Sequence, residues 1–351
     1  MQTHHRFVLA LTASTGEALG QYPVTPDWQP AREAVSLCRL RAGSDQPLPE
    51  DVPLSIDPIW DQAQGEPSAV GVAVSHEAHT VAVPLRYFRG LSQELGAKLV
   101  EEKKLGEGAK FSYELLAYRA PAPAPPARPP FTITALPVTL PFREVEVADW
   151  TARSAPDGTP GDENFPVFLE PQVLEEARAC TTAAEGVETG GVLIGHLLRD
   201  RATRDLALWI TAQIPAQHAP ATTVKLSFTP DTWVSVRAAI SLRNRGEQML
   251  GTWHSHPAIA WCAKCPPEQQ RECGLRMPFF SDDDVLLHRT VFGSAFCVGL
   301  VVTQALDGLR HGLFGWRAGL IEPRGFHLLG AEPVPNLIPD PAHAPTCPTH
   351  A

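Results

Sequence analysis

The sequence predicts a protein of the α+β class that is divided into two domains. Its 351 residues exceed the usual length of one domain, and 44% of them are hydrophobic, which is enough for a substantial core. Residues 119–130 carry six prolines in twelve positions, a composition that favours extended polyproline II over helix or central strand and predicts a linker. On both sides of this linker, runs with the period of strands occur together with runs that have the period of helices.

The segment before the linker, residues 1–118, is predicted to be a small α+β module. Strands are expected at 7–12, 70–75, 79–84 and 111–118, and a short turn at 77–78 would pair the second strand with the third. Leu91, Leu95 and Leu99 repeat at a spacing of four residues and predict a helix with one apolar face. We find no catalytic pattern in this module.

The segment after the linker, residues 131–331, is predicted to be the larger domain. Its expected helices cover 171–184, 231–243 and a short stretch after Ser281. Its expected strands cover 188–198, 205–214 and 249–257, followed by two strands within 295–316 that an Asp-Gly turn joins. Residues 332–351 again carry six prolines and predict a flexible tail.

Composition argues against several classes of protein. No apolar run reaches the eighteen or so residues that a membrane-spanning helix needs, so no membrane partner is expected. The first residues lack the apolar stretch and the cleavage site of a signal peptide, which predicts a cytoplasmic protein. A formal net charge of −10 argues against nucleic acid as a partner, because binding to phosphates needs clustered Lys and Arg.

The segment GTWHSHP at 251–257 holds the residues with the clearest chemistry. On an extended strand, residues two apart point to the same face, so His254 and His256 would present both imidazoles to one point. That arrangement is typical of metal ligands. A zinc site that keeps a position open for water needs a third ligand, which is commonly a carboxylate, and FFSDDDVLLHR at 279–289 offers candidates.

Three short patterns occur in order in this domain: ETGGVLIG at 188–195, HSHP at 254–257 and SDDD at 281–284. Together they resemble the ExxGxLxG, HSHP and SxxD signature of the JAMM (MPN+/JAB) metalloproteases. The resemblance covers approximately residues 165–320 and does not extend to the N-terminal module. It implies an α-β-α fold, with a mixed β-sheet flanked by helices. Members of that family are zinc isopeptidases that release ubiquitin or ubiquitin-like proteins.

The resemblance also implies a role for each matched residue. His254, His256 and Asp284 would bind a catalytic Zn²⁺ ion, Glu188 would act as the general base, and Ser281 would donate a hydrogen bond to the tetrahedral oxyanion. The chemistry supports this division independently, because zinc lowers the pKa of a bound water to about 7 and a nearby carboxylate can then carry its proton.

Other interpretations of these residues remain open. Ser281 and Asp284 also fit the start of a helix, with Ser281 as its N-cap. Asp282 and Asp283 are alternative ligands if the register is shifted. Glu185 competes with Glu188 as the base, although only Glu188 lies three residues before Gly191.

One feature departs from the family pattern, because 24 residues separate His256 from Ser281, more than the family spacing. We expect Trp261–Met277 to form one wall of the substrate groove, with Trp261 as a substrate-binding residue. A surface loop without a role is the alternative interpretation.

The same segment, Trp261–Met277, is called the insert below. It contains Cys262, Cys265 and Cys273, whose spacing is typical of a zinc knuckle that lacks one ligand. A second, structural zinc is therefore one hypothesis, with His288 or Cys297 as a candidate fourth ligand. Free thiols and a disulfide are the alternatives. A zinc nucleobase deaminase is disfavoured, because no His-x-Glu precedes the cysteine pair.

The sequence as a whole predicts a zinc isopeptidase or peptidase that cleaves after the C-terminus of a ubiquitin-like protein, in precursors or in conjugates. Its partners would be that protein, its conjugates and the associated activating and conjugating enzymes, and the N-terminal module would recruit or orient the substrate. An inactive MPN-type scaffold subunit and a DNA-repair-associated JAB protein are the alternatives.

Overall fold

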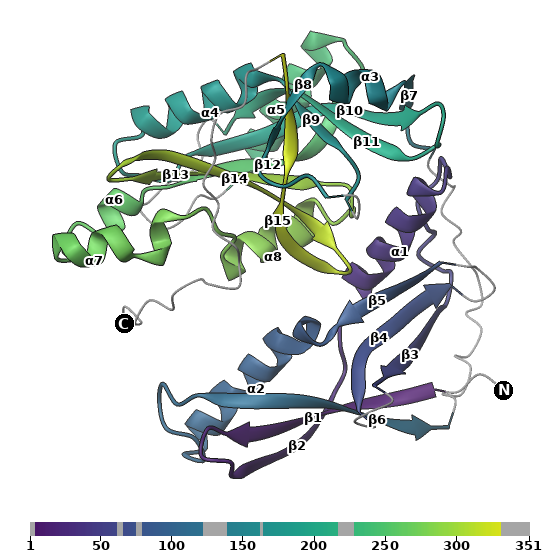
Figure 1. The fold of residues 1–351 in the computed structure, drawn as a ribbon, viewed down its shortest axis with the longest axis vertical. Helices are drawn as coiled ribbons and strands as arrows, with labels where there is room; N and C mark the ends of the chain where they lie inside the picture. The colour runs from purple at the N-terminus through teal and green to yellow at the C-terminus, as the bar shows by residue number, and fades with distance from the viewer. Residues whose placement is uncertain are drawn as a thin grey trace. The chain divides into compact units, whose positions relative to one another are not determined.

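The computed structural model describes residues 4–61, 66–74, 79–121, 139–161, 164–216 and 228–330. The predicted turn at 77–78, most of the predicted linker and the predicted tail lie outside these residues. The chain forms two compact units, each of which combines helices with sheets (Figure 1). The N-terminal unit comprises Met1–Arg39, Pro47–Val138 and Ala318–Leu320, and the C-terminal unit comprises Leu40–Gln46, Thr139–Arg317 and Ile321–Ala351.

The N-terminal unit contains two antiparallel sheets of three strands within its described residues. The first has the order β2-β1-β6, from β1 (His4–Ala13), β2 (Ala18–Val24) and β6 (Phe111–Ala120). The second has the order β3-β4-β5, from β3 (Leu54–Trp60), β4 (Pro67–Val74) and β5 (Thr80–Pro84). The helices are α1 (Gln29–Arg41), η1 (Leu85–Phe88) and α2 (Arg89–Glu101).

The core of this unit follows the alternation of its strands. Phe7, Leu9 and Leu11 of β1 are buried, and they belong to one cluster with Val70 and Val72 of β4. The predicted strands near 7–12, 70–75, 79–84 and 111–118 and the predicted helix are present. Strand β6 continues to Ala120, which pairs with His4, so the chain is still in the sheet at positions 119 and 120, where the linker was predicted to begin.

The C-terminal unit is built on one mixed sheet of ten strands within the described residues. The strands are β7 (Phe142–Val145), β8 (Ser154–Asp157), β9 (Val167–Leu169), β10 (Gly190–Asp200), β11 (Leu206–Pro215), β12 (Gln248–His256), β13 (Val298–Ala305), β14 (Gly308–Arg317), β15 (Leu320–Arg324) and β16 (Phe326–Leu329). Their order is β15-β14-β13-β12-β10-β11-β9-β16-β8, and β7 pairs with the second half of β10.

Helices lie on both sides of this sheet, with α4 on one side and α8 on the other (Figure 1). The helices are α3 (Val147–Ala152), α4 (Pro171–Ala183), α5 (Pro230–Arg243), α6 (Ala258–Trp261), α7 (Pro267–Glu272), η2 (Gly274–Arg276) and α8 (Asp282–Val291). Pro171 and Pro230 occupy the first positions of α4 and α5, where a missing N–H costs nothing. The arrangement agrees with the predicted mixed sheet flanked by helices.

Strands β10 and β12 form the centre of the sheet and carry two of the three sequence motifs. Every residue of β10 is buried. Strand β12 runs antiparallel to β10 on one side and parallel to β13 on the other, so its last residues are held from both edges.

Among the described residues, none of the helices combines the length and the apolar character that crossing a membrane requires.

Candidate metal centre

The two histidines of the HSHP motif end strand β12. Both side chains are almost fully buried, and their Nε2 atoms lie 3.1 Å apart. The two residues share one face of the strand, because they are two positions apart in extended backbone. The predicted convergence of the two imidazoles is therefore present in the structure.

Asp284 reaches the histidines from the first turn of helix α8. Its carboxylate oxygens lie 3.3 Å from Nε2 of His254 and 3.8 Å from Nε2 of His256. One ligand atom from each of the three residues falls within a group no more than 4.8 Å across. Asp282 and Asp283, the alternative ligands, are exposed, so the structure favours Asp284.

A capping box at the start of α8 holds Asp284 in this position. The carboxylate of Asp284 accepts hydrogen bonds from the backbone N–H of Ser281, at 2.8 Å, and from its hydroxyl, at 2.7 Å. In return, the backbone N–H of Asp284 donates to the Ser281 hydroxyl at 3.2 Å. The two interpretations of this motif, a helix cap and a metal ligand, are thus compatible, because the cap orients the ligand.

The protonation states of these residues suit a divalent cation. Burial, helped by the nearby His254, lowers the pKa of His256 to about 4. Burial alone would raise the pKa of Asp284, but His254, His256 and Ser281 outweigh it and hold that pKa well below its usual range. At neutral pH the site therefore offers a neutral imidazole and an ionised carboxylate, the forms in which these side chains bind zinc.

Glu188 lies directly before strand β10 and is 8% exposed. The register pairs Gly190 with His254, and the N–H of Ser255 donates to the carbonyl of Thr189 at 2.7 Å. If this antiparallel register continued two residues beyond β10, Glu188 would lie opposite His256 and on the same face of the sheet. Glu185, the alternative base, is exposed in the turn after α4, which favours Glu188.

The glycines of the first motif are explained by close packing of the sheet. A Cβ atom at Gly191 would collide with the carbonyl oxygen of Ile214, and one at Gly195 would collide with the carbonyl oxygen of Trp209. Any larger residue would force β10 away from β11. These glycines therefore act through the sheet that positions Glu188.

Aromatic rings surround the two histidines. The ring centroids of Trp261 and Phe279 lie 5.1 and 4.4 Å from that of His256, and the ring of Phe280 lies 5.7 Å from that of His254. Trp261 was singled out from the sequence, whereas the two phenylalanines were not. The available signal was their position directly before Ser281, at the start of the ligand-bearing helix.

The described residues do not bring Cys262, Cys265 and Cys273 together as a second metal centre. They form no compact group of three ligand atoms with one another or with His288 or Cys297. Cys262 is buried next to the end of α6, whereas Cys273 follows α7 directly. The described residues thus give the second zinc no support, and it stays a prediction.

Part of the C-terminal unit matches a known protein family. Residues 170–260 match the model of a family described as prokaryotic homologs of the JAB domain. Residues 170–260 thus belong to a JAB domain. The match includes Glu188, His254 and His256 and ends before most of the insert and Asp284. The resemblance to the JAB family is thereby confirmed over a segment that contains the first two of the three motifs.

The chain was also compared with solved structures and with curated proteins. A solution structure of a protein from Desulfitobacterium hafniense is 19% identical in sequence to the JAB-domain chain, with a TM-score of 0.30. The similarity covers 45% of this chain and 89% of that chain. No curated protein matches the chain.

Proposed function

We propose that the JAB domain is a zinc-dependent peptidase that cleaves peptide or isopeptide bonds after the C-terminus of a ubiquitin-like protein. The observation that carries this proposal is the convergence of His254, His256 and Asp284 on one point. The register of β10 with β12 supports a place for the buried Glu188 near the same end of β12. Two nitrogen ligands and one oxygen ligand are a donor set that zinc accepts while leaving a position open.

The chemistry divides between the metal and the residues around it. A zinc ion held by the three side chains would supply a Lewis acid and would lower the pKa of a water molecule toward neutrality. Glu188 would accept the proton of the attacking water and deliver it to the leaving amine.

Ser281 has two roles in this proposal. In the structure its hydroxyl donates to the carboxylate of Asp284, and its backbone N–H donates to the same oxygen. When the hydroxyl turns toward the substrate, the backbone bond still anchors Asp284. The hydroxyl is then free to donate to the developing oxyanion, an interaction worth about 3 kcal/mol of barrier in comparable sites.

The insert supplies the proposed substrate wall. Trp261 and Phe279 present rings beside His256, where an extended C-terminal segment would approach the metal. Main-chain hydrogen bonds to such a segment would give affinity, and the rings would select the neighbouring side chains.

Activating and conjugating enzymes of the same ubiquitin-like protein are the proposed partners, and the cytoplasm is the proposed location.

The test is cleavage of a ubiquitin-like protein from a C-terminal fusion or from a lysine conjugate. We expect Glu188→Gln to abolish turnover and to retain zinc, because an amide holds water but cannot take its proton. Glu185→Gln, in the exposed turn nearby, is the matched control and should keep wild-type turnover. Near-normal turnover in Glu188→Gln would contradict the assigned base, and absence of cleavage by the zinc-loaded wild type on every such substrate would favour an inactive scaffold.

A further inference from the structure

The N-terminal unit has two strands with free edges that face one cavity. Strand β1 pairs with β6 from His4 onward, but its pairing with β2 begins only at Phe7. Residues 4–6 therefore have no strand partner on that side among the described residues. Within the described ranges, strand β3 is the edge strand of the second sheet and pairs with β4 alone. Such edges present unpaired backbone groups that another extended chain can join.

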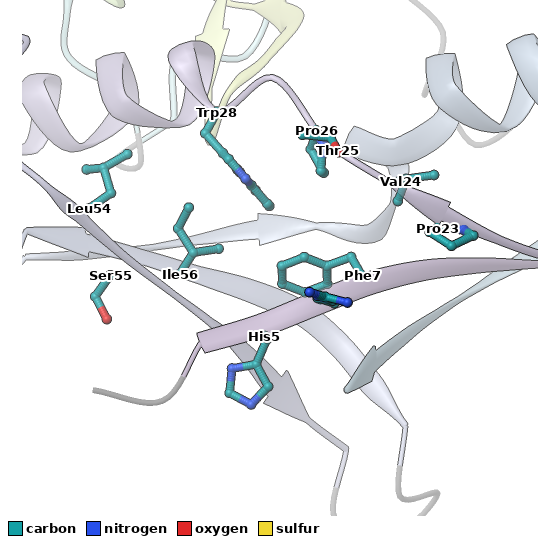
Figure 2. A pocket seen from close by; sticks show the side chains of 11 residues that line it. His5, Phe7, Pro23, Val24, Thr25, Pro26, Trp28, Leu54, Ser55 and Ile56 are labelled. Carbon is teal, nitrogen blue, oxygen red and sulfur yellow. The ribbon is translucent and has the colours of Figure 1, made fainter. Parts of the chain in front are cut away.

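A cavity of about 460 Å³ lies between these edges. Its lining comes from three places, namely the start of β1, the end of β2 with its connection to α1, and the start of β3: His5, Arg6, Phe7, Pro23, Val24, Thr25, Pro26, Trp28, Leu54, Ser55 and Ile56. Figure 2 shows Phe7, Trp28 and Ile56 from these three segments around the same space. The volume lies in the range of pockets that hold a ligand.

The aromatic wall of the cavity is rigid. Trp28 stacks on Tyr87 with ring centroids 5.7 Å apart, and it meets Phe7 edge-on at the same distance. Phe88, which is fully buried, closes the cluster behind them. An apolar side chain that enters this space meets a preformed surface, so little conformational entropy is lost on the side of the protein.

The charge of the lining is positive. Arg6 is exposed at the cavity, and among the described residues its guanidinium has no hydrogen bond or ion pair with another side chain. His5 lies beside Asp57, with 3.3 Å between Nδ1 and the carboxylate, so that carboxylate already has a neighbour. No acidic residue lines the cavity itself. The guanidinium of Arg6 is therefore available to an anionic group of a ligand.

We propose that this cavity binds an extended peptide segment of a partner protein that carries one apolar side chain and a nearby carboxylate. The backbone would add to a free strand edge, the apolar side chain would fill the space beside Trp28, and the carboxylate would pair with Arg6. This proposal concerns binding alone and stands independently of any hydrolysis by the JAB domain.

Fluorescence anisotropy with the full chain tests the proposal. The probes are two short fluorescein-labelled peptides of alternating Val and Thr around a central Leu, one with flanking Glu and one with flanking Lys. We expect saturable binding of the Glu peptide, about tenfold tighter than the Lys peptide, as a charged hydrogen bond would give. Arg6→Glu should reverse the preference, whereas Lys98→Glu, an equal charge change on α2, should leave it unchanged.

A second variant separates the cavity from the charge. Thr25→Trp, at an exposed lining position, should fill the space and weaken binding of the Glu peptide about tenfold. The circular dichroism spectrum of this variant should match that of the wild type. Binding of neither peptide by the wild type, or equal binding of both by the wild type and by Arg6→Glu, would overturn the proposal.

Discussion

Thr189 and Ser255 exchange two hydrogen bonds that join the segment of Glu188 to the segment of the two histidines. The N–H of Thr189 donates to the hydroxyl of Ser255 at 2.9 Å, and the N–H of Ser255 donates to the carbonyl of Thr189 at 2.7 Å. Thr189 follows Glu188 directly, and Ser255 lies between His254 and His256. The serine of the HSHP motif thus has a structural role, because it sets the position of the candidate base relative to the candidate ligands.

The first prediction concerns this link. Ser255→Ala should lower turnover more than zinc affinity, because the histidines stay on β12 whereas the start of β10 loses one anchor. We expect the free energy of unfolding to fall by about 1 kcal/mol, the usual effect of one lost hydrogen bond. Steady-state kinetics, zinc titration and urea unfolding measure the three quantities. Ser241→Ala, at an exposed serine on α5, should change none of them, and unaltered turnover in Ser255→Ala would contradict the assigned role.

The second prediction concerns the aromatic wall. Trp261→Ala should raise KM for a ubiquitin-like fusion and leave the zinc content unchanged, because Trp261 touches His256 from the insert and is no ligand. Deleting most of residues 261–277 should raise KM for the same fusion further than Trp261→Ala does. Trp60→Ala, an exposed tryptophan in the N-terminal unit, is the control. If the shortened chain kept both wild-type kinetic constants, the insert would be a loop without a role in cleavage.

The third prediction concerns the zinc content of variants in the cysteines of the insert. The double variant Cys262→Ser/Cys265→Ser should contain as much zinc as the wild type, because these thiols form no compact group with a third ligand among the described residues. Plasma mass spectrometry of both proteins gives the comparison. Loss of one metal equivalent in the double variant would show that the insert binds a second ion.

The fourth prediction is a dependence of stability on pH. Glu247 accepts hydrogen bonds from Arg243, at 2.6 and 2.8 Å, and from Thr211, and these outweigh burial and lower its pKa from the usual 4.5 to about 2. A carboxyl whose pKa is lower in the folded state stabilises the protein above its unfolded pKa. This contribution is lost as the pH falls from about 4.5 toward 2.

Glu247→Gln should therefore lower the free energy of unfolding at pH 7, and the difference from the wild type should shrink at pH 3. Urea unfolding at the two pH values measures it. Glu144→Gln, which breaks an ion pair with Arg204 in which both side chains are more than 40% exposed, should have little effect at either pH. A difference for Glu247→Gln that stays constant with pH would contradict the role of the buried carboxylate.

Much of the fold was predictable because the relevant signals are local. The strands β10, β12, β13 and β14 have apolar runs bounded by glycine or polar residues, and α4 and α5 begin with proline. Strands β2 and β3 were missed, because ALGQYPV and LSIDPIW contain prolines and lack a regular alternation. The short strands β7, β8 and β9 depend on partners distant in the sequence, which a local pattern does not contain.

The candidate site was predictable to the same extent. The HSHP motif identified two candidate ligands through the period of a strand, and Ser281 and Asp284 were identified by a spacing that also caps a helix. The fold of the insert and of β10 around the histidines determines where the rings of Phe279 and Phe280 lie. It also determines the two hydrogen bonds between Thr189 and Ser255. No spacing rule predicts them.

The zinc content of purified wild type and of His256→Ala tests the central claim most directly. We expect one equivalent of zinc in the wild type and close to none in His256→Ala, because two remaining ligands hold the ion far more weakly. His327→Gln, which replaces a histidine of β16 outside the group of three ligands, should retain the metal. The same zinc content in His256→Ala as in the wild type would contradict the proposed metal centre.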